Sequence, residues 1–200
     1  MRIFISTGLV VAVLGWGVSM VATAQPLQQP SVQAIQAALS GPATGSAGLT
    51  RSFTRTQPPT QDGLCGGAAA PAARSHGRNL EIVSYVPQAA HVDLAVPFAN
   101  DSDALTPQSR KVLKNLALAL KSQDLSGKRF VIAGHTSDSG ERAHNLELSC
   151  ARSMAVRKFL IHSGVAADRI SAYGFGPDQP AVAKDPGSED NRRVEIRVGE

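Results

Sequence analysis

Residues 129–152 read RFVIAGHTSDSGERAHNLELSCAR, and their pattern predicts the centre of the fold. Residues 130–133 (FVIA) are a compact apolar run between Arg129 and Gly134, which is typical of a buried strand. A polar turn between Gly134 and Gly140 follows, and the segment at 141–162 then has helical character and ends at Ser163-Gly164, a natural C-terminal stop. We therefore expect a strand, a tight turn and a long helix in direct succession.

The sequence on either side of this stretch predicts further strands and one more long helix. The other segments with strand character are LEIVSYV at 80–86, HVDLAVPF at 91–98, RISAY at 169–173 and RRVEIRV at 192–198. A helix is expected to begin at Thr106-Pro107, because threonine caps a helix and proline suits its first turn. After a leading strand at 80–86, the order βαβαββ predicts an α/β (α+β sandwich) fold, a mixed four-stranded sheet with helices packed on one face.

The first 78 residues have a different character. Residues 1–24 combine Arg2, an apolar run and a small-x-small site before Gln25, so they are expected to be a secretory signal peptide cleaved between Ala24 and Gln25. A membrane anchor is the alternative, since about 19 apolar residues could span a bilayer. Residues 25–78 are expected to hold a short amphipathic helix at 31–39 and then a flexible arm rich in Gly, Ala and Pro. The folded domain is expected over residues 79–200.

Composition restricts the function. The 200 residues carry 20 basic and 16 acidic side chains, a balance too even for a dedicated nucleic-acid binder. Catalytic signatures are missing: there is no G-x-S-x-G or HExxH motif, and His135 and His144 make a poor metal pair without a third ligand. We therefore expect no enzyme, no cofactor and no metal site.

The chain has two cysteines, Cys65 and Cys150. Export to an oxidising compartment would let them form a disulfide, and two unpaired thiols are the alternative.

One group of residues, the loop at 134–140 with Arg152, suits an anionic ligand. The loop at 134–140 joins a strand to a helix that carries Arg152, and helix N-terminal N–H groups and a guanidinium both favour a carboxylate. A carboxylate group beside them would complete a site for a zwitterion, because its oxygens could hold an ammonium group.

At these residues the sequence closely resembles the OmpA-like peptidoglycan-binding domain, which includes the OmpA C-terminal domain, Pal and MotB-like proteins. The resemblance covers about residues 92–198. The matching positions are Phe98, Asp101 and Ser102, then Gly134-His135-Thr136, Gly140, Asn145, Leu148-Ser149 and Arg152, and finally Asn191-Arg192-Arg193-Val194-Glu195-Ile196.

The resemblance implies non-covalent binding to the diaminopimelate residue of the peptidoglycan stem peptide. Arg152 would bind the carboxylate of that amino acid, and the position of the family's ammonium-binding acid holds Ser137. Three alternatives stay open: Asp138 substitutes for the acid, Asp101 assists, or wall binding is weak and the fold is a scaffold module that binds a protein partner.

The candidate ligand-binding residues are therefore Arg152, Asn145, Ser137, Asp138, Ser139, Thr136, Asp101, Phe98 and Arg193. For Asn145, ligand contact and ordering of the loop both stay open, and one of Arg192 and Arg193 is expected to face the site.

Peptidoglycan is the partner that the resemblance implies, in the periplasm and possibly in association with the outer membrane. Any membrane association is expected to be indirect or through a partner. Residues 25–78, with the helix at 31–39, are the expected attachment point for an envelope protein partner.

Overall fold

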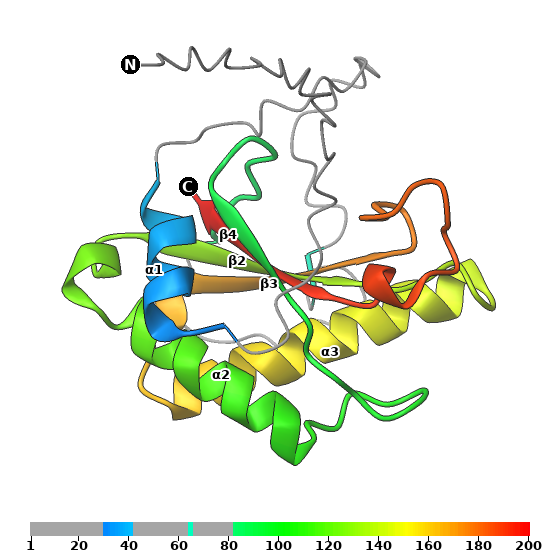
Figure 1. The fold of residues 1–200 in the computed structure, drawn as a ribbon, viewed down its shortest axis with the longest axis horizontal. Coiled ribbons are helices and arrows are strands. Elements are labelled where there is room, and N and C mark those ends of the chain that lie inside the picture. The colour runs from blue at the N-terminus through cyan, green and yellow to red at the C-terminus, as the bar shows by residue number, and fades with distance from the viewer. Residues whose placement is uncertain (1–29, 42–63, 66–81) are drawn as a thin grey trace, which may run out of the picture.

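The structure is a computed structural model that describes residues 30–41, 64–65 and 82–200 (Figure 1). Its helices are α1 (Val32–Ser40), α2 (Pro107–Leu120) and α3 (Arg142–His162), and its strands are β1 (His91–Leu94), β2 (Arg129–His135), β3 (Ile170–Gly176) and β4 (Val194–Gly199). Short 3-10 helices η1 (Gln123–Leu125), η2 (Ala167–Arg169) and η3 (Glu189–Asn191) lie in the connections. The predicted signal peptide and most of the predicted arm lie outside the described residues.

The strands form one mixed sheet in the order β1-β4-β2-β3. β4 is antiparallel to both β1 and β2, whereas β2 and β3 are parallel and are connected through α3. The helices pack on one face of this sheet, where the main hydrophobic core lies (Figure 1). From β1 onward the element order is βαβαββ, so the predicted fold class is confirmed.

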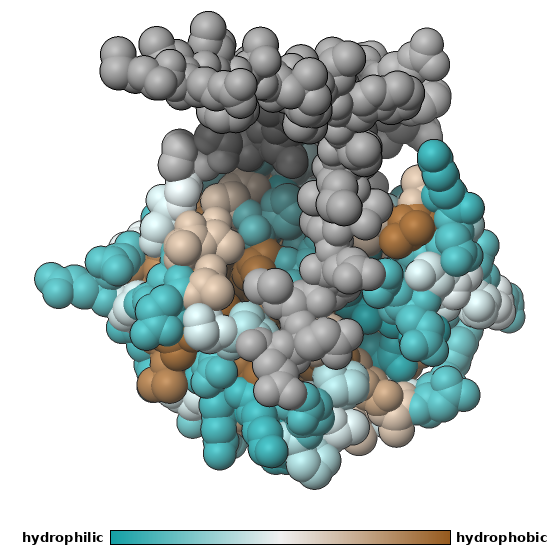
Figure 2. All heavy atoms as spheres, viewed as in Figure 1, coloured by the Kyte–Doolittle hydropathy of each residue, from teal (hydrophilic) through white to brown (hydrophobic). Residues whose placement is uncertain are grey.

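Side chains along each strand alternate between the two faces of the sheet. In β2, Phe130 and Ile132 join the core under the helices, while Val131 and Ala133 belong to a second cluster on the opposite face. Tyr173 of β3 completes that second cluster. Hydrophilic side chains cover most of the outer surface of the helical layer over α2 (Figure 2).

Two glycines allow α3 to lie directly against the sheet. A Cβ atom at Gly134 would lie 2.3 Å from the carbonyl oxygen of Ser149, and one at Gly174 would lie 2.7 Å from the backbone nitrogen of Cys150. Glycine at both positions is therefore required by the close approach of the two backbones. This contact fixes the first half of α3 beside the loop that follows β2.

The predicted leading strand is wrong for its described part, residues 82–86, which lie over the far face of the sheet without forming a strand. The backbone of Val83 bonds to side chains of β3 instead of to a neighbouring strand. Its N–H donates to the Ser171 hydroxyl at 3.0 Å, and its carbonyl accepts from the Tyr173 hydroxyl at 2.9 Å.

The first strand of the sheet is shorter than predicted and ends at Leu94. Leu94 pairs with Val194, which is the first residue of β4, so the residues after Leu94 have no partner strand. Phe98 instead forms an isolated bridge with Leu105.

The short N-terminal helix is confirmed, but it belongs to the folded domain. Ser31 caps α1 by accepting a hydrogen bond from the N–H of Ala34, as a serine N-cap should. Ile35 and Leu39 are fully buried in the main core, and α1 lies next to α2 (Figure 1). A nine-residue helix gains little stability alone, so it forms by burying this apolar face. The sequence suggested that a partner attaches at this helix, but its apolar face already packs against the domain itself.

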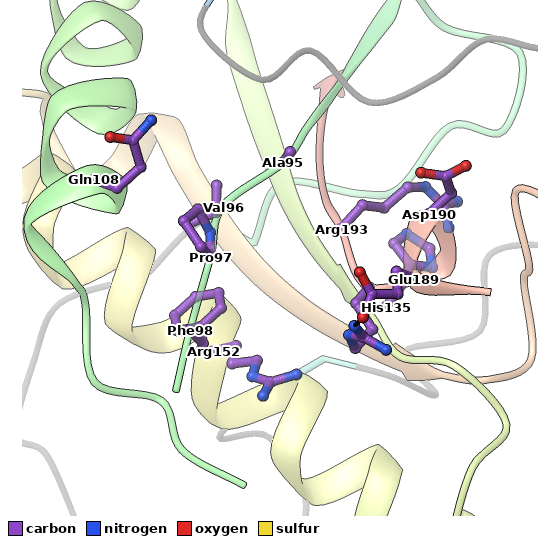
Figure 3. A pocket seen from close by; sticks show the side chains of 11 residues that line it. Ala95, Val96, Pro97, Phe98, Gln108, His135, Arg152, Glu189, Asp190 and Arg193 are labelled. Carbon is purple, nitrogen blue, oxygen red and sulfur yellow. Dashed lines mark ion pairs between the residues drawn. The ribbon is translucent and has the colours of Figure 1, made fainter. Parts of the chain in front are cut away.

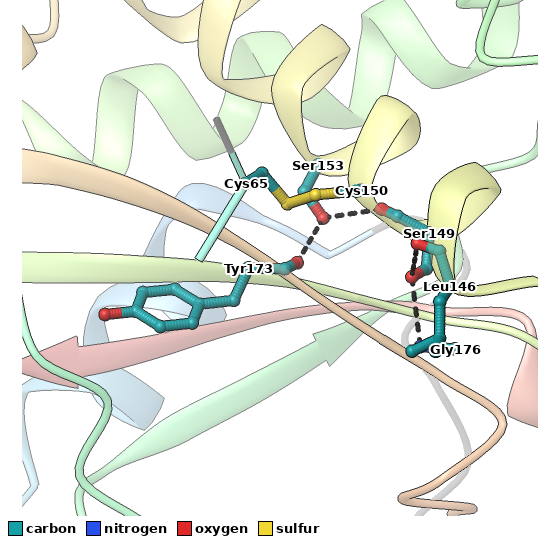
Figure 4. The surroundings of a disulfide bond; sticks show 7 residues. All are labelled: Cys65, Leu146, Ser149, Cys150, Ser153, Tyr173 and Gly176. Atoms are coloured by element: carbon teal, nitrogen blue, oxygen red, sulfur yellow. Dashed lines mark hydrogen bonds between the residues drawn. A yellow bond between two sulfur atoms is a disulfide. The ribbon is translucent and has the colours of Figure 1, made fainter. Parts of the chain in front are cut away.

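The predicted pairing of the cysteines is confirmed (Figure 4). Cys65 and Cys150 form a disulfide, with their Cα atoms 5.5 Å apart. Leu64 bridges to Tyr173, and the N–H of Cys65 donates to the carbonyl of Ala172 at 2.9 Å. The disulfide thus fastens residues 64–65 to α3, and their backbone contacts hold them along the outer edge of β3.

No helix among the described residues is long and apolar enough to cross a membrane.

Candidate functional site

A pocket of about 270 Å³ opens where the segment after β1, helix α3 and helix η3 meet (Figure 3). Of the predicted ligand-binding residues, Phe98, Arg152 and Arg193 line it. The lining also includes Gln108, His135, Glu189 and Asp190, which were not predicted to bind a ligand, and Arg192, the predicted alternative to Arg193.

Arg152 is the central cation of this pocket. Its side chain is held in place by two contacts. Nε donates to the backbone carbonyl of Ser102 at 3.0 Å, and the guanidinium lies over the ring of Phe98, 5.0 Å from its centre. The residue is only 8% exposed. None of the ion pairs within the described residues includes Arg152.

The surroundings of Arg152 disfavour its charge. Burial lowers the pKa of its guanidinium, the nearby Arg192 acts in the same direction, and Asp101 and Asp103 oppose them only partly. An arginine nevertheless stays protonated in proteins. A buried guanidinium without a carboxylate partner is therefore suited to receive a carboxylate from a ligand.

Asp101 lies in the loop between β1 and α2 and does not line the pocket. Its backbone has a positive φ of 51°, and its carboxylate lies 2.5 Å from Nε2 of His144 at the start of α3. This contact joins the loop to α3. The carboxylate of Asp101 thus already has a partner.

The loop after β2 is near the pocket in sequence but contributes little to its lining. Thr136 and Ser137 are buried, Asp138 and Ser139 are exposed, and none of the four lines the pocket. Asn145 is also buried and donates from Nδ2 to the carbonyl of Ser139 at 2.9 Å. Of the two roles left open for Asn145, the structure thus supports ordering of the loop.

The two neighbouring arginines of the final motif have different environments. Arg193 is buried, and its Nε donates to Asp93 at 3.1 Å while both terminal nitrogens donate to the carbonyl of Gln179. Arg192 is exposed and forms an ion pair with Glu189 at 2.5 Å. Although both line the pocket, Arg192 has more donors left for a ligand.

Helix η3 brings two acidic residues, Glu189 and Asp190, to the pocket. The loop before it is ordered by Asn191, which is fully buried, accepts from the N–H of Val182 and donates to the carbonyls of Asp185 and Pro186, each at 2.9 Å. The sequence signal for these acids is their position directly before the NRRVEI motif. Sequence alone does not reveal that the loop brings both residues to the pocket.

A buried charged network occupies the far face of the sheet beside the pocket. Glu195 pairs with Arg197 and lies 3.6 Å from the ring of His135. Burial alone raises the pKa of Glu195, but the His135 and Arg197 side chains outweigh it and lower this pKa to about 2. Burial lowers the pKa of His135, so its ring is neutral at pH 7. Within the described part of the chain, no group of three or more His, Cys, Asp or Glu residues is placed to hold a metal ion.

The network predicts a pH-dependent stability. The pKa of Glu195 in the folded protein lies below its ordinary value of 4.5. Its ionised form therefore adds fully to the free energy of unfolding above about pH 4.5, and this contribution is lost as the pH falls toward about 2. Glu195→Gln leaves Arg197 without its carboxylate and should lower the free energy of unfolding at neutral pH by about 3 kcal/mol. In urea unfolding at a series of pH values, the gap between wild type and variant should shrink between pH 4.5 and 2. A gap that stays constant would show that Glu195 gains no protonation-dependent stability.

Comparison with known proteins shows that part of the chain is similar to one family. Residues 97–193 match the model of the OmpA family. The chain is 36% identical over 115 residues to outer membrane porin F of Pseudomonas fluorescens, covering 56% of this chain and 35% of that protein. It is 35% identical over 102 residues to the peptidoglycan-associated lipoprotein of Pseudomonas aeruginosa, covering 50% of this chain and 59% of the relative.

Two further matches are a curated relative and a solved structure. The peptidoglycan-binding protein ArfA of Mycobacterium bovis is 35% identical over 105 residues, which cover 52% of this chain and 32% of that protein. The OmpA-like domain of FopA1 from Francisella tularensis is 19% identical, with a TM-score of 0.47 over 75% of this chain and 98% of that one. The chain spans less than two thirds of the length of porin F, the peptidoglycan-associated lipoprotein and ArfA. Over residues 97–193 the chain is thus similar to the OmpA family.

Proposed function

We propose that this protein binds cell-wall peptidoglycan non-catalytically, through the diaminopimelate residue of the stem peptide. The observation that carries the proposal is Arg152, a buried guanidinium in a pocket with no carboxylate partner among the described residues. The family match and the relatives whose names include peptidoglycan support the same ligand. Arg152 binds the carboxylate at the side-chain end of diaminopimelate, and the ring of Phe98 holds the guanidinium through a cation–π contact.

The proposed location is the periplasm, in association with the outer membrane, after cleavage between Ala24 and Gln25. Relatives named as outer-membrane and lipoprotein components support this location. Because the apolar face of α1 is buried, attachment to an envelope protein involves another part of residues 25–78 or none of them.

Ser137 supports a second candidate function, a scaffold module that binds an envelope protein and binds the wall weakly or not at all. Serine carries no charge to hold an ammonium group, and loss of a charge-assisted hydrogen bond costs about 1.5–3 kcal/mol. The two functions make different predictions for the same assay.

The test is sedimentation of the mature protein with purified sacculi. Wild type should sediment with sacculi that contain diaminopimelate and remain in solution with sacculi that have lysine at that position, because lysine lacks the second carboxylate. Ser137→Asp should bind diaminopimelate sacculi as tightly as wild type or up to about tenfold more tightly, as an added charge-assisted contact would.

Each alternative has a distinct outcome. If wild type stays in the supernatant while Ser137→Asp sediments, the scaffold function is favoured. Equal binding of wild type to both kinds of sacculi would contradict recognition of diaminopimelate while leaving wall binding in place.

A further inference from the structure

We propose that Glu189 holds the ammonium group of the bound amino acid, in place of an acid from the loop after β2. This inference rests on the proposed function and assigns a recognition role to a residue outside the matching motifs. Figure 3 shows Glu189 and Arg152 approaching the pocket from different elements, Glu189 from η3 and Arg152 from α3. The pocket thus has a cation and an acid on separate walls.

The distribution of acids around the pocket supports Glu189. Among the described residues, the acids that line the pocket are Glu189 and Asp190. Asp190 also lines a second cavity on the side of Arg193, and in Figure 3 its carboxylate points away from Arg152. The Glu189 side chain is 88% exposed, so an incoming ligand can reach it.

The acids that the sequence favoured are less well placed. Asp138 is exposed but does not line the pocket, and its backbone N–H is bonded to Pro186. Asp101 lies outside the pocket as well and contacts His144 at 2.5 Å. Ser137 is only 5% exposed and has no charge. None of these three side chains therefore lies where a ligand on Arg152 would place its ammonium group.

The charges around Arg152 indicate which chemical class of ligand fits. Arg192 lies close enough to Arg152 to lower its pKa, and Glu189 pairs with Arg192. A carboxylate can accept about four hydrogen bonds, so Glu189 can keep Arg192 and still accept from an ammonium group. A simple anion would be attracted by the arginines and repelled by Glu189. A carbon that carries both an ammonium and a carboxylate, as at the free end of diaminopimelate, could place the carboxylate on Arg152 and the ammonium on Glu189.

The test compares two soluble stem tripeptides by calorimetry with the full mature chain. One is alanyl-γ-glutamyl-meso-diaminopimelate, and the other is the same peptide acetylated on the side-chain amino group, which removes the ammonium charge. Wild type should prefer the free amine by about tenfold or more, and Glu189→Gln should bind the two peptides equally. Because the readout is a ratio, a general change in attraction for anionic ligands cancels.

Two variants serve as matched controls. Glu147→Gln removes one exposed acid of α3 that does not line the pocket, and Asp138→Asn removes the rival acid. Both should keep the preference for the free amine. Loss of the preference in Asp138→Asn but not in Glu189→Gln would overturn the inference.

The sedimentation assay separates this failure from failure of the proposed function. If wild type binds sacculi through Arg152 but shows no preference between the two peptides, Glu189 has no such role and the proposed function stands. If wild type binds neither sacculi nor peptides, the proposed function fails and the inference fails with it.

Discussion

Arg152→Ala should lower the affinity for diaminopimelate sacculi by roughly a hundredfold, the largest effect that we expect on binding. A guanidinium that forms two charge-assisted hydrogen bonds to a carboxylate contributes about 3 kcal/mol, which corresponds to that factor. Arg152→Lys should retain part of the affinity, because lysine keeps the charge but loses the planar fork. The measurement is the dissociation constant from sedimentation at increasing amounts of sacculi.

Arg157→Ala is the matched control for a loss of folding. Arg157 lies on the same helix and also donates to backbone carbonyls, those of Ile170 and Ala167, but it does not line the pocket. Both variants should therefore lose some free energy of unfolding, and only the Arg152 variant should lose wall binding. If Arg152→Ala binds as wild type does while remaining folded, the pocket is not the wall-binding site.

The fold was predictable where the sequence has a strong local signal. The strand at β2, the turn at Gly140 and the long helix α3 lie within a residue or two of the prediction, because apolar periodicity and a positive φ of 89° at Gly140 are encoded locally. The segment at 82–86 was mistaken for a strand because its composition suits a strand. The backbone of Val83 bonds to side chains of β3 and that of Ser84 bonds to Glu200, and composition cannot reveal such long-range contacts.

The candidate site was predictable only in part, for a related reason. Arg152 and Phe98 could be identified because both occupy motif positions, Arg152 on α3 and Phe98 in the segment before α2. The structure brings both to one pocket. Glu189 and Arg192 reach that pocket through the loop that Asn191 orders, so their placement depends on tertiary hydrogen bonds. Arg193, in turn, could not be separated from Arg192 without knowing that Asp93 lies across the sheet on β1.

Removal of the disulfide by Cys65→Ala/Cys150→Ala should lower the free energy of unfolding by about 2–4 kcal/mol. The bond joins residues 85 positions apart, and such a large closed loop restricts the unfolded chain strongly. It also holds Leu64 against Tyr173 and over the outer edge of β3. The measurement is urea unfolding without reductant, and reduced wild type should unfold at the same urea concentration as the double variant.

Wall binding should respond differently, and this separates stability from recognition. The pocket is lined by the segment after β1, by α3 and by the η3 region, with Gln108 from α2 and His135 from β2. Neither Cys65 nor Cys150 lines it. The double variant should therefore bind sacculi within about twofold of wild type under conditions in which both are folded. A large loss of binding in the folded variant would mean that the disulfide positions α3, and with it Arg152, against the loop after β1. An unchanged free energy of unfolding would mean instead that the contacts of α3 with β2 and β3 hold this edge of the sheet without the covalent link.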